Sequence, residues 1–309
     1  MLEMPEMFER HLSLGQKAYQ EAQYESARGH FEEAYQLKDD IEANLWLTKS
    51  LMTLGLYQNA YDILMEKKTY YLTKEEGVDV YFEVILNLNF FLEIEKLLVT
   101  TNSDKRLEWE SSYQTVKDYQ LLMHPDKYKT LIESLTNLHE LPPMKQGNAL
   151  KNLVFLPKEM AVEIAEKLLI DQKVSLFMRS ELVQELVALQ ITSAVKILTY
   201  DGSLKEFQPN EMEKLTLVYQ KSELLKELSH YFSKRDPALE AEVLKAVKIH
   251  IGLLYPFHET EMVPMNKWCE RYIQIYQGEG DIPLEEDELI EVSKKQDKLD
   301  EAVFQLLFF

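Results

Sequence analysis

Cysteine is almost absent from this chain of 309 residues, whose single thiol belongs to Cys269. One cysteine excludes an intramolecular disulfide framework and any metal site built from several thiolates. The sequence therefore favours a reducing, cytoplasmic setting, with Cys269 in the core. The chain also lacks a basic segment followed by an apolar run at its start, and it lacks an apolar stretch long enough to span a bilayer. We therefore expect no membrane partner.

Glycine and proline are scarce as well, at 9 and 10 residues. A fold of many strands needs many tight turns, and tight turns draw heavily on these two residues. The composition is otherwise that of an ordinary soluble protein, with 46% hydrophobic and 28% charged residues. A mainly helical fold is therefore predicted, and the length allows about two domains or one continuous solenoid.

Positive charge is in deficit, because 34 Lys and Arg residues face 53 Asp and Glu residues, for a formal net charge of −19. Such a chain repels a phosphate backbone, and no Lys/Arg cluster in the sequence is large enough to reverse this locally. We therefore expect no nucleic-acid partner. Two explanations of the acidity stay open, namely solubility and a preference for basic peptide partners.

Catalytic and metal-binding signatures are missing too. The seven histidines form no His-x-x-x-His or His-Glu-x-x-His pair, and the chain has no nucleophile elbow, phosphate loop or dinucleotide glycine pattern. The nearest carboxylate cluster, His258 with Glu259 and Glu261, is interpreted as a loop with solvated charge. The sequence thus predicts a protein that is not an enzyme and holds no cofactor and no metal.

What the chain does contain is helical periodicity, clearest near its start. Two segments, Phe8–Glu21 and Tyr24–Leu37, have apolar residues recurring three and four positions apart. The small residues Gly15 and Ala27 leave space for two helices to cross closely, and Phe31 fills the gap beneath them. This stretch is therefore expected to form a tightly packed helix pair.

The spacing of this pair resembles the tetratricopeptide repeat, with Gly15 at the eighth position of the repeat. The matching residues are Leu14, Gly15, Tyr24, Ala27, Phe31 and Ala34, whereas His11 and Asp39 replace the consensus Trp and Pro. A second copy follows at a shift of 33 residues, with Tyr57 and Ala60, and a weaker third copy carries Phe91, Ile94 and Leu98. The resemblance implies an α-solenoid, because a single repeat cannot bury its own apolar face.

The remaining chain is predicted to be helical, with one exception. Residues 1–101 are assigned to the repeats, 102–143 to a connecting helix pair ended by Pro142 and Pro143, and 144–309 to a domain of HEAT-like helices. Within that domain Asp201-Gly202 separates two β-prone runs, which predicts a β-hairpin at about 194–207 with a type I′ turn and one face packed on helices. The combination of the degenerate repeats with this helix-hairpin unit, Leu182–Phe207 followed by Pro209, also resembles repeat proteins of low-GC Gram-positive bacteria over most of the chain, a resemblance that implies no known chemistry.

The tetratricopeptide resemblance also implies a partner groove on the inner helices. The groove residues are Glu9, Leu12, Gln16 and Tyr19 of the first repeat, Leu45, Lys49 and Met52 of the second, and Glu83 of the third. The family's carboxylate clamp uses Lys and Asn at two of these places, where this chain has Leu12 and Gln16. We therefore predict a protein or peptide partner that lies extended or helical in a slightly acidic groove.

Two alternatives concern other parts of the chain. An enzyme or small-molecule binder is the rival hypothesis, with a pocket near residues 120–145. The tripeptide His124-Pro125-Asp126 in that region matches the loop of J-domain co-chaperones, but its flanks lack the family's other elements, so it is interpreted as a helix start. The apolar end Val303–Phe309 either caps the fold or binds a partner.

Overall fold

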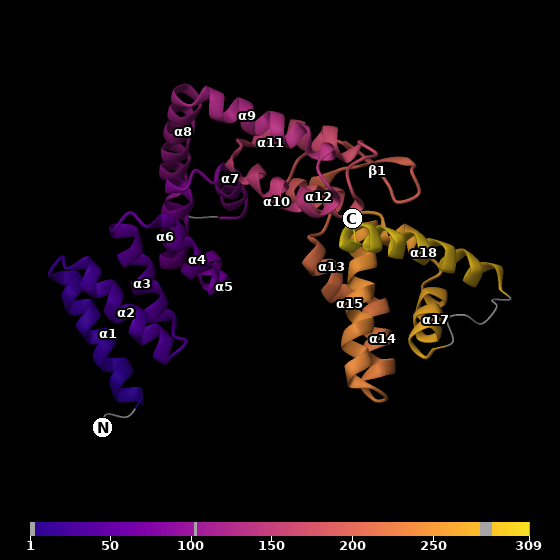
Figure 1. Cartoon of the computed structure of the whole chain (residues 1–309), viewed down its shortest axis with the longest axis horizontal. Coiled ribbons are helices and arrows are strands. Elements are labelled where there is room, and N and C mark those ends of the chain that lie inside the picture. The colour runs from indigo at the N-terminus through magenta and orange to yellow at the C-terminus, as the bar shows by residue number, and fades with distance from the viewer. Residues whose placement is uncertain (1–3, 102–103, 279–285, 309) are drawn as a thin grey trace. The chain divides into compact units, whose positions relative to one another are not determined.

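The structure is a computed structural model that describes residues 4–101, 104–278 and 286–308. Figure 1 shows a mainly helical chain, and the described residues contain one sheet, which has two strands. The all-α prediction with a single hairpin is therefore confirmed. The chain forms two compact units, a first unit of residues 1–125 with 154–157, and a second unit of residues 126–153 with 158–309. The three-part division at residues 101 and 143 stays a prediction.

The first unit consists of helices that pack against their neighbours in sequence. Helix α1 contacts α2 and α3, α3 contacts α4 and α6, and α6 contacts α7 and α8. The helices are α1 (Met4–Gln20), α2 (Tyr24–Leu37), α3 (Ile41–Thr53), α4 (Tyr57–Met65), α5 (Lys68–Thr73), α6 (Glu75–Asn87), α7 (Phe91–Thr100) and α8 (Arg106–Met123). A continuous solenoid through both units stays a prediction.

The close crossing of α1 and α2 occurs where the small residues predicted it. A β-carbon on Gly15 would lie 2.6 Å from Cε1 of Phe31, so only glycine permits this approach. Ala27 and Phe31 are fully buried, and the Phe31 ring stacks on Trp46 with centroids 5.7 Å apart. Leu14, in contrast, is 38% exposed and adds little to this core.

Helix α5 is an insertion that the repeat spacing did not predict. Its Tyr71 is 1% exposed, and its hydroxyl donates to Asn44 Oδ1 at 2.8 Å and lies 3.1 Å from Thr48 Oγ1. The amide of Asn44 in turn donates to the Ile63 carbonyl oxygen at 2.9 Å. These bonds satisfy polar groups that would otherwise be buried without partners. They also fix α5 against α3.

The second unit contains the remaining helices and the hairpin. Its α-helices are α9 (Pro125–Thr136), α10 (Pro143–Leu150), α11 (Lys158–Leu169), α12 (Leu176–Ala188), α13 (Leu215–Lys221), α14 (Glu223–Ser233), α15 (Pro237–Leu254), α16 (His258–Glu261), α17 (Met265–Tyr276) and α18 (Asp287–Phe308). Only Pro125, the first residue of α9, belongs to the first unit. Short 3₁₀ helices are η1 (Leu138–Glu140), η2 (Lys151–Phe155) and η3 (Pro209–Glu211). Pro125 begins a helix, as predicted.

The apolar periodicity over residues 208–232 favours one long helix, but the chain there is divided into η3, α13 and α14. Ser222 ends α13 and caps α14, because its Oγ accepts from the Leu225 amide at 3.3 Å. A serine at such a position satisfies an amide that has no partner within the helix. The side-chain cap therefore outweighed the continuous apolar periodicity.

The hairpin pairs β1 (Val195–Leu198) with β2 (Leu204–Phe207), and Val195 lies opposite Phe207. Val195, Ile197 and Phe207 are buried, and β1 contacts α11, so packing of one face on helices is confirmed. The type I′ turn is wrong. Gly202 has a φ of +83°, but Asp201 is not at positive φ, and the Gly202 amide donates to the Thr199 carbonyl at 3.1 Å. This is a type I turn followed by a glycine bulge.

The core of the second unit contains a polar network among α15, α17 and α18. Nδ1 of His250 lies 2.6 Å from the Tyr272 hydroxyl, and its Nε2 lies 3.0 Å from Asp300 Oδ1. Burial raises the pKa of Tyr272 well above its usual value. The hydroxyl therefore stays protonated and available as a donor.

Two predictions about single side chains have different outcomes. Cys269 was expected in the core but is only half-buried on α17. On α18, Phe304 is 53% exposed. The side chains of residues 305–308 and all of Phe309 lie outside the described part of the structure, so a cap and a partner-binding end both stay open.

Candidate partner-binding face

The predicted groove residues come from three helices that pack in succession, α1, α3 and α6. We call their shared side the α1–α3–α6 face. Glu9 and Glu83 are exposed there, and Gln16, Tyr19 and Lys49 are half-buried. The other three predicted residues are Leu12, Leu45 and Met52, each only 7% exposed. These apolar residues therefore support the face from below, and the polar residues form its surface.

A repeated polar contact links neighbouring helices across this face. Gln16 Nε2 donates to Glu42 Oε1 at 2.9 Å, joining α1 to α3, and Lys49 Nζ contacts Glu76 Oε1 at 2.5 Å, joining α3 to α6. Gln16 and Lys49 hold equivalent positions in the predicted repeats, as do Glu42 and Glu76. The same geometry thus recurs from one helix pair to the next. We call these contacts the polar ladder.

Aromatic rings surround the middle of the face. The Tyr19 hydroxyl lies 3.0 Å from Thr53 Oγ1, and its ring meets Trp46 edge-on with centroids 5.3 Å apart. Lys49 Nζ lies 5.3 Å from the Trp46 ring centroid, within reach of a cation–π interaction. The sequence analysis did not name Trp46, because its role depends on contacts between helices.

The charge on the α1–α3–α6 face is predominantly negative. Lys49 of α3 already contacts Glu76, and Lys105, which precedes α8, contacts Asp79 Oδ2 of α6 at 2.5 Å. Beyond these pairs the face carries Glu9, Glu42 and Glu83. A surface of this kind attracts positively charged molecules.

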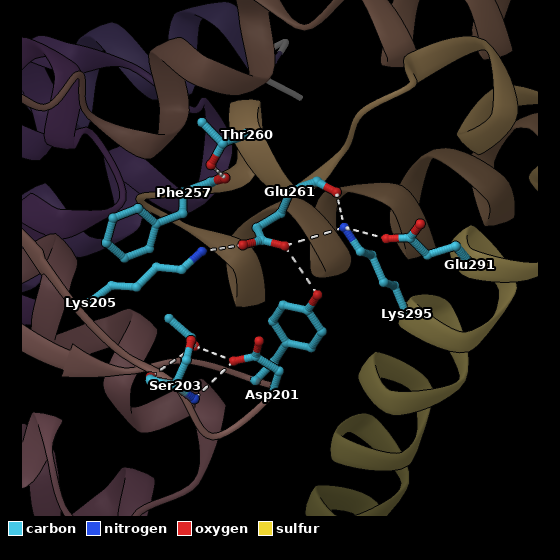
Figure 2. Close-up of polar contacts among 10 residues, drawn as sticks. Asp201, Ser203, Lys205, Phe257, Thr260, Glu261, Glu291 and Lys295 are labelled. Carbon is cyan, nitrogen blue, oxygen red and sulfur yellow. Dashed lines mark hydrogen bonds and ion pairs between the residues drawn. The ribbon is translucent and has the colours of Figure 1, made fainter. Parts of the chain in front are cut away.

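A second polar cluster lies in the second unit and is centred on Glu261 of α16 (Figure 2). Its carboxylate accepts from Lys205 Nζ on β2, from the Tyr200 hydroxyl at 3.1 Å, and from Lys295 Nζ on α18 at 3.4 Å. The Glu261 side chain is 14% exposed, so the prediction of a solvated loop is wrong for this residue. The contributing residues are far apart in sequence and form no recognisable spacing.

The charges of the Glu261 cluster stabilise contacts within the second unit. Burial alone raises the pKa of Glu261, but the hydrogen bonds from Lys205 and Tyr200 outweigh it, so that the pKa is lowered overall. The neighbouring cavity, which Glu261 lines with Tyr200 and Arg179, has a volume of about 10 Å³. That is room for about one water molecule. The cluster therefore joins the hairpin, α16 and α18, and it offers no space for an organic ligand.

Within residues 4–101, 104–278 and 286–308, no group of three or more His, Cys, Asp or Glu side chains could hold a metal ion. Across the same residues no helix has both the length and the apolar character needed to cross a bilayer. Residues 120–145, the place of the rival pocket, are divided between the two units, and that hypothesis stays a prediction.

Comparisons of the chain with protein-family models, with curated proteins and with solved structures find no match.

Proposed function

We propose that this chain is a non-catalytic interaction module of the tetratricopeptide type, which binds a basic peptide or helix on its α1–α3–α6 face in the bacterial cytoplasm. The polar ladder carries the proposal, because equivalent residues make equivalent contacts between successive helices. A regular spacing of helices suits the recognition of an extended or helical segment. The tight packing of Gly15 against Phe31 adds support, since it is the packing that the repeat resemblance implies.

The chemistry of the face indicates the class of partner. Glu9 on α1 and Glu83 on α6 are exposed carboxylates, and the lysine of α3 is already paired. Each exposed ion pair with a lysine or arginine of the partner contributes about 0.2–1 kcal/mol. Leu12, Leu45 and Met52, each 7% exposed, form the apolar floor of the proposed groove.

The test is selection of binding peptides from a random display library on three versions of the full chain. These are the wild type, the double variant Glu9→Gln with Glu83→Gln, and a control with Glu33→Gln and Asp62→Asn. The control removes the same charge from α2 and α4, which lie outside the face. Enriched peptides are then measured individually by fluorescence anisotropy.

We expect wild-type selection to enrich peptides with net positive charge. The double variant Glu9→Gln with Glu83→Gln should bind them about 2- to 30-fold more weakly, which corresponds to the loss of two exposed ion pairs. The control should bind as the wild type does. Enriched peptides without positive charge, or equal binding by all three proteins, would show that the face is not the binding surface.

A further inference from the structure

A pocket that the sequence analysis did not anticipate lies between α14 and α17, two helices that pack against each other in the second unit (Figure 1). It is a depression largely open to solvent, with a volume of about 670 Å³. One wall comes from α14 and the residues just after it, and the other from α17. The residues that matter here are Lys226, His230, Lys234, Arg235, Cys269 and Ile273.

The charge of this pocket is opposite to that of the chain. Lys226, His230 and Lys234 follow one another at intervals of four, which places them on one side of the helix. With Arg235 they supply three permanent positive charges and one histidine, and Glu227 is the acidic residue among the lining side chains. In a chain of net charge −19, this is a local reversal of sign, so the expectation that no Lys/Arg cluster reverses the charge locally is wrong at this pocket.

The positive side chains of the pocket differ in the contacts that they already make within the protein. Lys226 contacts Glu223 at 2.7 Å. Arg235 lies 4.0 Å from the Tyr231 ring centroid, and its Nη1 donates to the Tyr231 carbonyl at 2.9 Å. This orients the guanidinium and leaves its other N–H groups for a ligand. Lys234 makes no ion pair with the residues that the structure describes.

A simpler explanation covers only part of this cluster. Positive side chains stabilise a helix C-terminus, and Lys234 and Arg235 follow the last residue of α14, Ser233. His230 also lies in the last turn of α14, whereas Lys226 lies about two turns before the helix end, where the dipole gives little benefit. The helix-end effect also does not explain why the four groups face one pocket together with Ile273.

We propose that this pocket binds a small organic phosphate ester. The phosphate would be held by Lys234 and Arg235, because Lys and Arg are the side chains that form charge-assisted hydrogen bonds to phosphate oxygens. The organic part would lie against Tyr231 and Ile273, which supply apolar surface. This site is independent of the α1–α3–α6 face, and the proposal does not depend on the peptide-binding function.

Binding is tested with ATP as the probe, by isothermal titration calorimetry on the full chain without divalent cations. Inorganic pyrophosphate and adenosine serve as separate probes for the charged and the organic parts. The variant is Lys234→Gln with Arg235→Gln. The control is Lys17→Gln with Lys167→Gln, which removes the same charge from exposed positions outside the pocket. Circular dichroism and the unfolding midpoint establish that the variants fold.

We expect ATP to bind the wild type and the control alike, and the pocket variant to bind at least about tenfold more weakly. Pyrophosphate should bind more weakly than ATP, and adenosine weakest, because the ester carries both parts. No heat of binding with ATP, or equal binding by the folded pocket variant, overturns the proposal. If pyrophosphate binds as tightly as ATP, the proposed contact with the organic part of the ligand is wrong, and the pocket is a site for an inorganic anion.

Cys269 gives a second readout, since it lines the pocket and is the chain's one thiol. Burial, with nearby Glu227, raises the pKa of Cys269 to about 11, so alkylation by iodoacetamide is slow at pH 8. We expect saturating ATP to slow it further, by several-fold, in the wild type and not in the pocket variant. ATP that binds without changing the rate would place the nucleotide elsewhere.

Discussion

Replacing Gly15 by alanine tests the packing on which the first helix pair depends. The new methyl group would lie 2.6 Å from Cε1, 2.8 Å from Cδ1 and 2.9 Å from Cζ of Phe31. The Phe31 ring has no free space to move into, because it is fully buried and stacked on Trp46. The helices must therefore separate or the ring must leave its rotamer.

The chain offers a matched control for the magnitude. Gly29 lies in α2, and a β-carbon there would meet nothing within 4 Å. Gly29→Ala should stabilise the helix by about 0.5–1 kcal/mol, through the backbone entropy that glycine loses on folding. Gly15→Ala gains the same stabilisation from backbone entropy, but overpacking against Phe31 lowers the free energy of unfolding by about 1–3 kcal/mol. The two variants should therefore differ by about 1–3 kcal/mol in free energy of unfolding.

Native-state hydrogen exchange measured by mass spectrometry is the suitable assay, because it reports on the first helices separately from the second unit. Peptides from α1, α2 and α3 should exchange faster in Gly15→Ala than in Gly29→Ala. Peptides from α14–α17 should be unchanged in both variants and serve as the internal reference.

A third variant decides whether the clash with Phe31 is the cause. In a Phe31→Leu background the ring atoms that the methyl group would meet are gone. Gly15→Ala should then stabilise by about as much as Gly29→Ala does. If Gly15→Ala is stabilising in the wild-type background, or equally destabilising with Leu at position 31, the packing argument is wrong.

Two further predictions concern buried and turn polar groups. Tyr71→Phe should destabilise the chain by about 1–3 kcal/mol in urea unfolding, since Asn44 Oδ1 loses a buried donor; a change under about 0.5 kcal/mol would contradict this. Hydrogen bonds from Thr199 and the Ser203 amide lower the pKa of Asp201 to about 2. This lowered pKa adds stability above the unfolded value near pH 4 that is lost as the pH falls toward 2. Asp201→Asn should therefore lower the free energy of unfolding by less than about 1 kcal/mol at pH 7, because solvent screens this exposed group. The difference in free energy of unfolding from the wild type should become smaller below pH 4, and a difference that does not change with pH would refute the assignment.

Local features of the sequence predicted most of the helices and the hairpin. Periodicity placed α2, and Asp201-Gly202 located the turn between β1 and β2. The turn type was wrong, because the Asp201 carboxylate bonds Thr199 and Ser203 and stabilises a type I turn. The rule for Asp-Gly pairs does not include such side-chain bonds.

The predicted groove residues also show that sequence spacing does not reveal contacts between side chains. Spacing put Leu12, Gln16 and Lys49 on one face, but spacing does not distinguish a buried leucine from a half-exposed polar residue. Nor does it indicate that Gln16 and Lys49 reach carboxylates on the next helix. The repeat spacing likewise did not predict α5, because its Tyr71 is held by hydrogen bonds to α3 and by packing against α6, which are contacts between helices.

The sequence by itself determined the helical class, the close crossing at Gly15 and the overall negative charge, because each depends on composition or on residues near one another in the chain. Tertiary structure alone decided which charges meet. It brought Lys205 and Lys295 to Glu261, and it set Lys226, Lys234 and Arg235, from α14 and the residues just after it, around one pocket with α17 in an acidic protein. Contacts of this kind join residues distant in sequence, and only the packing of the helices brings them together.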